Sequence, residues 1–276
     1  MRAWRWMLGS WAFFLSGCVG DVRDVSEEVL EARTPLVEGN KLSSNSLALN
    51  SLALNSLALN SLALNSMDSQ SLAAIQDPGS QGALARAFLR YAIGCAFDVS
   101  QSLSFSFTDA AGLVHEETYH GELGLAPEWA TTALDYFGQR MVSACVVARV
   151  NYYEVPVLIS MRSAVPPLHL APAPELSQFP HIEGAFWGNL WGSSPAIYAC
   201  YKRENVANSR AFARDCAAGH LRNDGTIEEC GMIDIVGPCD TFCSTQKGDP
   251  YYQSCIDQPR KAGKGSTQML VTTALP

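Results

Sequence analysis

The chain has few basic residues for its length, and this deficit limits what it can bind. Its 276 residues include 19 Lys and Arg, only five of them lysines, against 27 Asp and Glu, for a formal net charge of −8. A protein that follows a nucleic-acid backbone needs a basic stripe to neutralise the phosphates. The composition therefore excludes nucleic acid as a partner.

The sequence also lacks a long apolar run without charges. Its longest candidate, Met141–Met161, contains Arg149, Glu154 and Pro156. A transmembrane helix needs about 20 consecutive, predominantly apolar residues. We therefore expect this stretch to belong to a folded body.

Sequence motifs for catalysis and for metal binding are missing as well. No GxSxG nucleophile motif occurs, and Cys239 and Cys243 are not spaced as a CxxC pair. His115 and His120 are five residues apart, whereas the zinc-binding histidines of an HExxH helix are four apart. The sequence accordingly identifies no catalytic site, no metal site and no cofactor.

What the sequence does contain begins with an export signal. Arg2 and Arg5 precede the apolar segment Met7–Leu15, and Leu-Ser-Gly-Cys follows at 15–18. The apolar segment is too short to span a bilayer. The pattern resembles a bacterial lipobox, which implies cleavage before the cysteine and acylation of its thiol.

Residues 1–17 are thus predicted to be a lipoprotein signal peptide, and Cys18 the lipidated N-terminus of the mature chain. Two or three acyl chains anchor a protein to a lipid bilayer without a transmembrane helix. Val19 follows the cysteine, in place of the Asp that usually retains a lipoprotein in the inner membrane. This favours an exported protein anchored in the outer membrane of a Gram-negative bacterium.

The remaining cysteines are expected to form disulfides, because exported proteins fold in an oxidising compartment. Their even number favours four bonds. Two lie alone in the first half of the body and six crowd into the last third, which favours pairing Cys95 with Cys145. The eight are Cys95, Cys145, Cys200, Cys216, Cys230, Cys239, Cys243 and Cys255.

Between the anchor and the body lie an acidic tether, 18–39, and a five-residue repeat, 40–76, that includes four identical NSLAL units. Leu-Ala-Leu alternates like a short strand and Asn-Ser is typical of turns. The repeat is similar in its Leu and Asn spacing to a pentapeptide-repeat solenoid. A low-complexity spacer is the alternative, and both readings stay open.

The body is predicted to be α+β: a small, disulfide-stapled domain of helices and antiparallel strands with a cysteine-rich, irregular C-terminal part. The spacing of Leu84, Phe88, Tyr91 and Cys95 predicts an amphipathic helix, with Arg86 on its polar side.

Further elements follow from the same patterns. Alternation over 103–107 predicts a strand that a turn joins to a second strand ending near residue 119. A second helix is expected over 139–150 and a strand over 155–161. In domain terms we expect a helix and strand subdomain (80–165), a proline-rich connector (166–180), a cysteine-rich subdomain (181–260) and a flexible tail (261–276).

The densest aromatic cluster supplies the candidate binding residues Trp187, Asn189 and Trp191. Tryptophan faces beside an amide can stack on a sugar or hold a peptide. The alternative is core packing, which is the more common fate of large aromatic side chains.

A thiol hydrolase is the alternative function. A helical Cys145, a following strand and then His181 have the chain order in which papain-like and transglutaminase-like folds present nucleophile and base. Against this, Cys145 lies in an apolar helix interior, where nothing lowers the pKa of its thiol.

Four segments together carry a family resemblance: 124–129 (GLAPEW), 142–145 (VSAC), 183–190 (EGAFWGNL) and 198–200 (YAC). On these the body resembles uncharacterised lipoproteins of myxobacterial-type predatory bacteria. The resemblance implies no activity. We therefore expect an exported, membrane-anchored lipoprotein with a binding or structural role at the cell surface, its partner a cell-envelope glycan or protein.

Overall fold

The computed structural model describes residues 42–43, 69–153, 155–169, 171–192, 194–261 and 265–276. The signal peptide, Cys18, the tether and most of the repeat lie outside these residues. Within the described part, no helix has both the length and the apolar character to cross a membrane.

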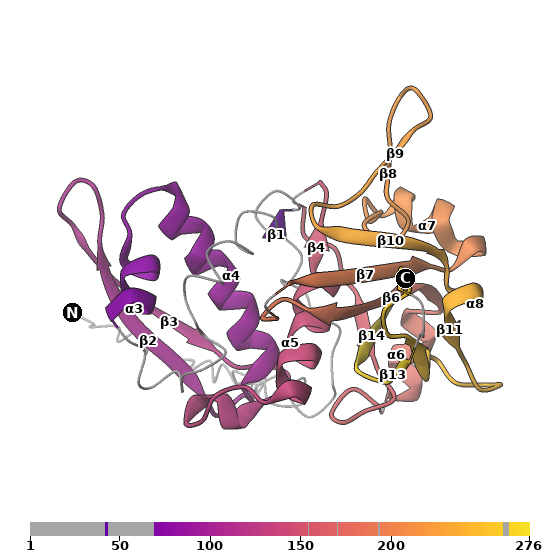
Figure 1. Cartoon of the computed structure of the whole chain (residues 1–276), viewed down its shortest axis with the longest axis horizontal. Coiled ribbons are helices and arrows are strands. Elements are labelled where there is room, and N and C mark those ends of the chain that lie inside the picture. Colours follow the sequence, from indigo (N-terminus) through magenta and orange to yellow (C-terminus); the bar gives the residue numbers. More distant parts are fainter. Residues whose placement is uncertain (1–41, 44–68, 154, 170, 193, 262–264) are drawn as a thin grey trace, which may run out of the picture. The chain divides into compact units, whose positions relative to one another are not determined.

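Helices and short helical turns are distributed along the whole described body (Figure 1). They are α3 (Ser69–Gln76), α4 (Ser80–Ala96), η2 (Pro127–Ala130), α5 (Tyr136–Ala148), α6 (Ala173–Gln178), η3 (Arg203–Asn205), α7 (Val206–Ala211) and α8 (Cys239–Phe242).

The strands form one larger sheet and several small ones. They are β1 (Leu42–Ser43), β2 (Ser102–Thr108), β3 (Val114–His120), β4 (Val150–Asn151), β5 (Ser160–Arg162), β6 (His181–Asn189), β7 (Ala196–Tyr201), β8 (His220–Leu221), β9 (Ile227–Glu228), β10 (Ile233–Pro238), β11 (Cys243–Ser244), β12 (Ser254–Ile256), β13 (Ser266–Thr267) and β14 (Leu270–Leu275). The α+β class predicted from the sequence is confirmed.

A hairpin packs against the first two helices. Strands β2 and β3 pair antiparallel in full register, from Ser102 opposite His120 to Thr108 opposite Val114. Alternate residues of both strands are half-buried or buried, and in β2 this is the pattern that the serine–aromatic alternation predicts. The last eight residues of the expected repeat spacer are helix α3, whose Ile75 is fully buried.

Arg86 is not on a polar face, and that prediction is wrong. Its side chain is buried, and its Nη1 donates to the backbone carbonyls of Ile75 and Asp77, 2.8 Å from each. Its guanidinium also lies 3.6 Å from the centre of the Phe107 ring. The arginine therefore connects α3, α4 and the hairpin.

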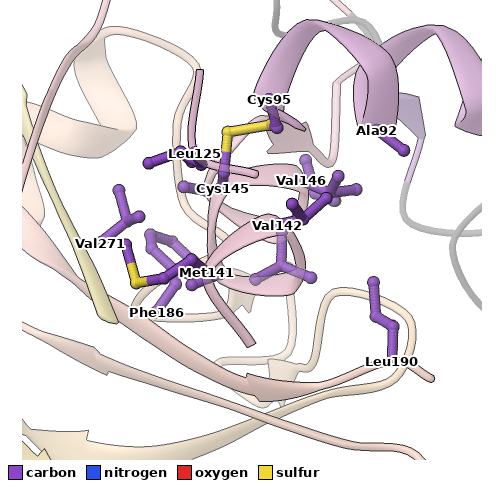
Figure 2. Close-up of a cluster of buried hydrophobic side chains, with 14 of the residues drawn as sticks. Ala92, Cys95, Leu125, Met141, Val142, Cys145, Val146, Phe186, Leu190 and Val271 are labelled. Carbon is purple, nitrogen blue, oxygen red and sulfur yellow. A yellow bond between two sulfur atoms is a disulfide. The ribbon is translucent and has the colours of Figure 1, made fainter. Parts of the chain in front are cut away.

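A disulfide joins α4 to α5, as predicted. Cys95 and Cys145 are bonded, both are fully buried, and Figure 2 shows the bond between the two helices above Met141 and Phe186. Closing a loop of 50 residues stabilises the fold by about 4 kcal/mol in the chain-entropy model.

The five-stranded sheet runs in the order β10-β7-β6-β14-β5, with β10 parallel to β7 and the other pairs antiparallel. Helix α5 packs on one face, where Phe186 and Val271 join the larger core cluster. Ala185, Trp187 and Leu270 point to the opposite face, into a second cluster. Both faces of the centre of the sheet are therefore buried.

The C-terminal residues are not a flexible tail. Strand β14 lies between β6 and β5, and all six of its residues are buried. The prediction of a tail rested on the Gly-Lys-Gly-Ser-Thr sequence at 263–267. Thr272 and Thr273 are nevertheless fully buried, and their hydroxyls are used in hydrogen bonds.

The two expected subdomains are one unit. The described residues from 69 onward belong to a single compact unit, and one hydrophobic cluster extends from Ile75 to Leu275. The division was wrong because α5 covers the sheet that the later residues build. Within the expected connector lies α6, and the strand expected over 155–161 is reduced to β5.

Candidate functional site: the tyrosine–histidine cluster

Two adjacent tyrosines mark the turn that follows α5 and β4. Asn151, fully buried, shapes this turn: its Oδ1 accepts from the backbone N–H of Tyr153 at 2.8 Å, and its Nδ2 donates to the carbonyl of Val155 at 2.9 Å. An Asn side chain that closes a turn in this way fixes the direction of the residues it spans. Tyr152 is half-buried and Tyr153 is 40% exposed.

A second tight turn delivers an aspartate and a histidine to the same place. The carbonyl of Asp215 accepts from the N–H groups of Ala218 and Gly219, and His220 then opens β8. Gly219 has a φ of +83°, and a Cβ there would lie 2.3 Å from Cγ2 of Ile227. Only glycine satisfies both conditions, so Gly219 sets the position of His220.

These two turns meet in what we call the tyrosine–histidine cluster: Tyr152, Tyr153, Asp215, His220 and Glu228. His220 Nδ1 lies 2.9 Å from Asp215 Oδ2, and the hydroxyl of Tyr153 donates to the same oxygen at 3.1 Å. The rings of Tyr152 and His220 are stacked, with centroids 3.8 Å apart and an interplanar angle of 8°. The hydroxyl of Tyr152 donates to Glu228 Oε2 at 3.3 Å.

Charge and burial define the hydrogen-bonding roles of the cluster. Partial burial, then the nearby Asp215 carboxylate, raises the pKa of Tyr153; partial burial, then the Glu228 carboxylate, raises the pKa of Tyr152. The hydrogen bond from Arg222 lowers the pKa of Glu228. At neutral pH both tyrosines are therefore neutral donors, and Glu228 is an ionised acceptor.

The cluster also has unused acceptors. If Nδ1 of His220 donates to Asp215, the Nε2 nitrogen is left as the acceptor, and Nε2 makes no hydrogen bond to any residue that the structure describes. Asp215 is 1% exposed, and its Oδ1 has no hydrogen-bond partner among these residues. A buried carboxylate oxygen without a donor is uncommon in a folded protein, and Asp215 therefore has capacity beyond the bonds to His220 and Tyr153.

Arg214 holds the two halves of the cluster together. Its side chain is fully buried, and it donates to the carbonyls of Val150 and Ala148 at 2.9 and 3.0 Å, immediately before the tyrosine turn. It also forms an ion pair of 2.8 Å with Glu183, which is 1% exposed. Arg214 is the neighbour of Asp215, so one guanidinium fixes both chain segments.

The ion pair between Arg214 and Glu183 is also connected to the five-stranded sheet. Glu183 lies on β6, and its Oε2 also accepts from the hydroxyl of Thr273 on β14 at 2.8 Å. The residue before Arg214, Ala213, has a φ of +53°. For a residue with a Cβ this left-handed conformation costs about 1 kcal/mol or more, so the bonds of Arg214 must hold it in place.

The binding residues predicted from the sequence are largely inaccessible. Trp187 is fully buried, with its Nε1 donating to the carbonyl of Ile256 at 3.0 Å, and Trp191 is 4% exposed. Asn189 is half-buried and uses its side chain within the body, donating to Gln139 and accepting from the Trp191 N–H. Both tryptophans therefore pack in the core, which is the alternative that the sequence left open.

The residues of the thiol-hydrolase alternative are not brought together as nucleophile and base. Cys145 is bonded to Cys95 and has no free thiol while that bond is intact, and His181 is exposed at the start of β6. The other six body cysteines also pair: Cys200–Cys239, Cys216–Cys230 and Cys243–Cys255.

Sequence reasoning missed the tyrosine–histidine cluster. His220 and Tyr153 are 67 residues apart, and no motif spacing links them. The one local signal was the Arg214-Asp215-Cys216 triplet, in which two charges precede a cysteine that a disulfide buries.

Comparisons with protein-family models, curated proteins and solved structures find no match for this chain.

Replacing Arg214 with Met should lower the free energy of unfolding by about 3–5 kcal/mol, because the Glu183 carboxylate then stays buried without its partner. Urea titration of the protein with its disulfides intact measures this. Arg260→Met is the matched control: Arg260 pairs with Asp234 at 2.6 Å on the surface, where an ion pair contributes at most about 1 kcal/mol. Equal losses in the two variants would contradict the role assigned to Arg214.

Proposed function

We propose that the protein is an exported lipoprotein whose body binds a glycan of the cell envelope at the tyrosine–histidine cluster. The observation that carries the proposal is an exposed tyrosine ring, Tyr153, beside a histidine, His220, whose Nε2 makes no hydrogen bond to any residue that the structure describes. Sugars offer apolar C–H faces for stacking and hydroxyls for hydrogen bonding, and the cluster has complementary groups for both.

The proposed anchor is the acylated Cys18. The sequence has nine cysteines, and the eight in the body pair among themselves, so Cys18 is the one left for another chemistry. Four disulfides fit an exported protein. The lipobox-like 15–18 segment and the absence of Asp after it support anchoring in an outer membrane.

Replacing Cys18 with Ala should abolish acylation, because the thioether to the lipid forms at this sulfur. Cells fed a labelled fatty acid should incorporate it into the wild-type protein and not into the variant, and the variant should accumulate as uncleaved precursor. Cys243→Ala serves as the control that keeps Cys18. Label found in the Cys18→Ala protein would overturn the anchor assignment.

Replacing Tyr153 with Ala should weaken binding to purified peptidoglycan sacculi about tenfold, whereas Tyr153→Phe, which keeps the ring, should lose less. The matched control is Phe137→Ala, because Phe137 is 39% exposed and lies outside the cluster. Sedimentation of the protein with sacculi measures the affinity. No binding by the wild-type protein, or equal binding by Tyr153→Ala, would refute the proposed site.

The same experiment separates binding from hydrolysis. A histidine held through Nδ1 by a buried aspartate can act as a general base through Nε2. If the sacculi are still intact after incubation with the protein, the site binds the glycan without cleaving it. If they are cleaved, and both His220→Asn and Asp215→Asn stop the cleavage, the site is hydrolytic, with His220 as the base in place of the Cys145 and His181 pair.

A further inference from the structure

Two of the four disulfides touch one another. Cys200–Cys239 joins β7 to the start of α8, and Cys243–Cys255 joins β11 to β12. The Sγ atoms of Cys200 and Cys243 are 3.5 Å apart. With both disulfides intact neither sulfur carries a hydrogen, so this is a van der Waals contact between two sulfurs of different disulfides.

The two bonds differ in their access to solvent. Cys200 and Cys239 are fully buried and Cys255 is 2% exposed, whereas Cys243 is half-buried. Cys243 and Cys255 stand directly opposite each other where β11 and β12 pair over only two residues. A pairing this short at the edge of the body opens locally at little cost, so a thiolate from solvent reaches this bond first.

We propose that these four cysteines form a thiol–disulfide exchange relay that responds to an external dithiol. The dithiol reduces the Cys243–Cys255 bond: two electrons pass to the protein, the dithiol becomes a disulfide, and two thiols form. The Cys243 thiolate then attacks the adjacent Sγ of Cys200. A Cys200–Cys243 bond forms, the Cys200–Cys239 bond breaks, and Cys239 leaves as a thiolate that takes up the proton Cys243 lost.

The exchange would change which disulfide connects β7 to the segments packed beside it. In the oxidised form Cys200 ties β7 to α8, and Cys255 ties β12 to β11. After the exchange β7 is tied to Cys243, which directly follows α8, and β12 loses its disulfide to β11. Tyr252 and Cys255 belong to the core cluster on this face, so its packing becomes dependent on the redox state.

The remaining two disulfides provide internal controls. Cys95–Cys145 is fully buried between α4 and α5, and Cys216–Cys230 is 0–1% exposed. Among the residues that the structure describes, neither bond contacts a sulfur of another disulfide. Neither is therefore expected to exchange with a neighbour.

Limiting dithiothreitol, added to the folded mature protein and quenched with N-ethylmaleimide, tests the relay. Peptide mass spectrometry should find Cys200 joined to Cys243, with Cys239 and Cys255 alkylated in equal amounts and the two control disulfides intact. Alkylation of Cys243 and Cys255 with Cys200–Cys239 unchanged would overturn the proposal. So would a purified protein in which the four cysteines are free thiols holding a zinc ion.

A variant tests the second step without a reductant. In Cys255→Ser the Cys243 thiol has no partner, so part of the protein should contain the Cys200–Cys243 bond and a free Cys239. Cys145→Ser is the matched control, in which Cys95 should remain a free thiol. A Cys255→Ser protein that folds with Cys243 alone alkylated contradicts the relay, and if it does not fold the dithiothreitol experiment decides.

Discussion

The way in which three chain segments meet in this protein depends on one fully buried charge, the guanidinium of Arg214. It pairs with Glu183 of β6, and it donates to the carbonyl of Ala148 at the end of α5 and to that of Val150 at the start of β4. Burying an ion pair brings little net stability, because desolvation offsets the attraction. Its effect is one of position, since a single guanidinium holds β6, the end of α5 and the start of β4 at one point.

The candidate site is a consequence of that constraint. Val150 leads directly into the Tyr152–Tyr153 turn, and Asp215 follows Arg214, so the arginine fixes both sides of the tyrosine–histidine cluster. The Cys216–Cys230 disulfide then closes the hairpin that carries His220 and Glu228. Side chains from four short segments are held within hydrogen-bonding distance, although all four segments are turns or two-residue strands.

The sequence predicted what local periodicity controls. Helix α4, the β2–β3 hairpin and the Cys95–Cys145 bond follow from apolar spacing and cysteine distribution. It failed where distant segments decide: β14 looked like a polar tail because its place between β6 and β5 is set by residues some 90 positions earlier. For Trp187 the sequence left both a binding platform and core packing open, and its burial shows the second. The tyrosine–histidine cluster has no spacing to detect.

The claim that the buried pair positions the site, rather than stabilising the fold, is tested most directly by amide hydrogen exchange on the double variant Glu183→Leu/Arg214→Met. Apolar residues of similar volume can replace a buried ion pair without loss of stability. The account predicts global unfolding close to that of the wild-type protein, with reduced amide protection confined to residues 149–153 and 214–220. Unchanged protection in these two segments would contradict it.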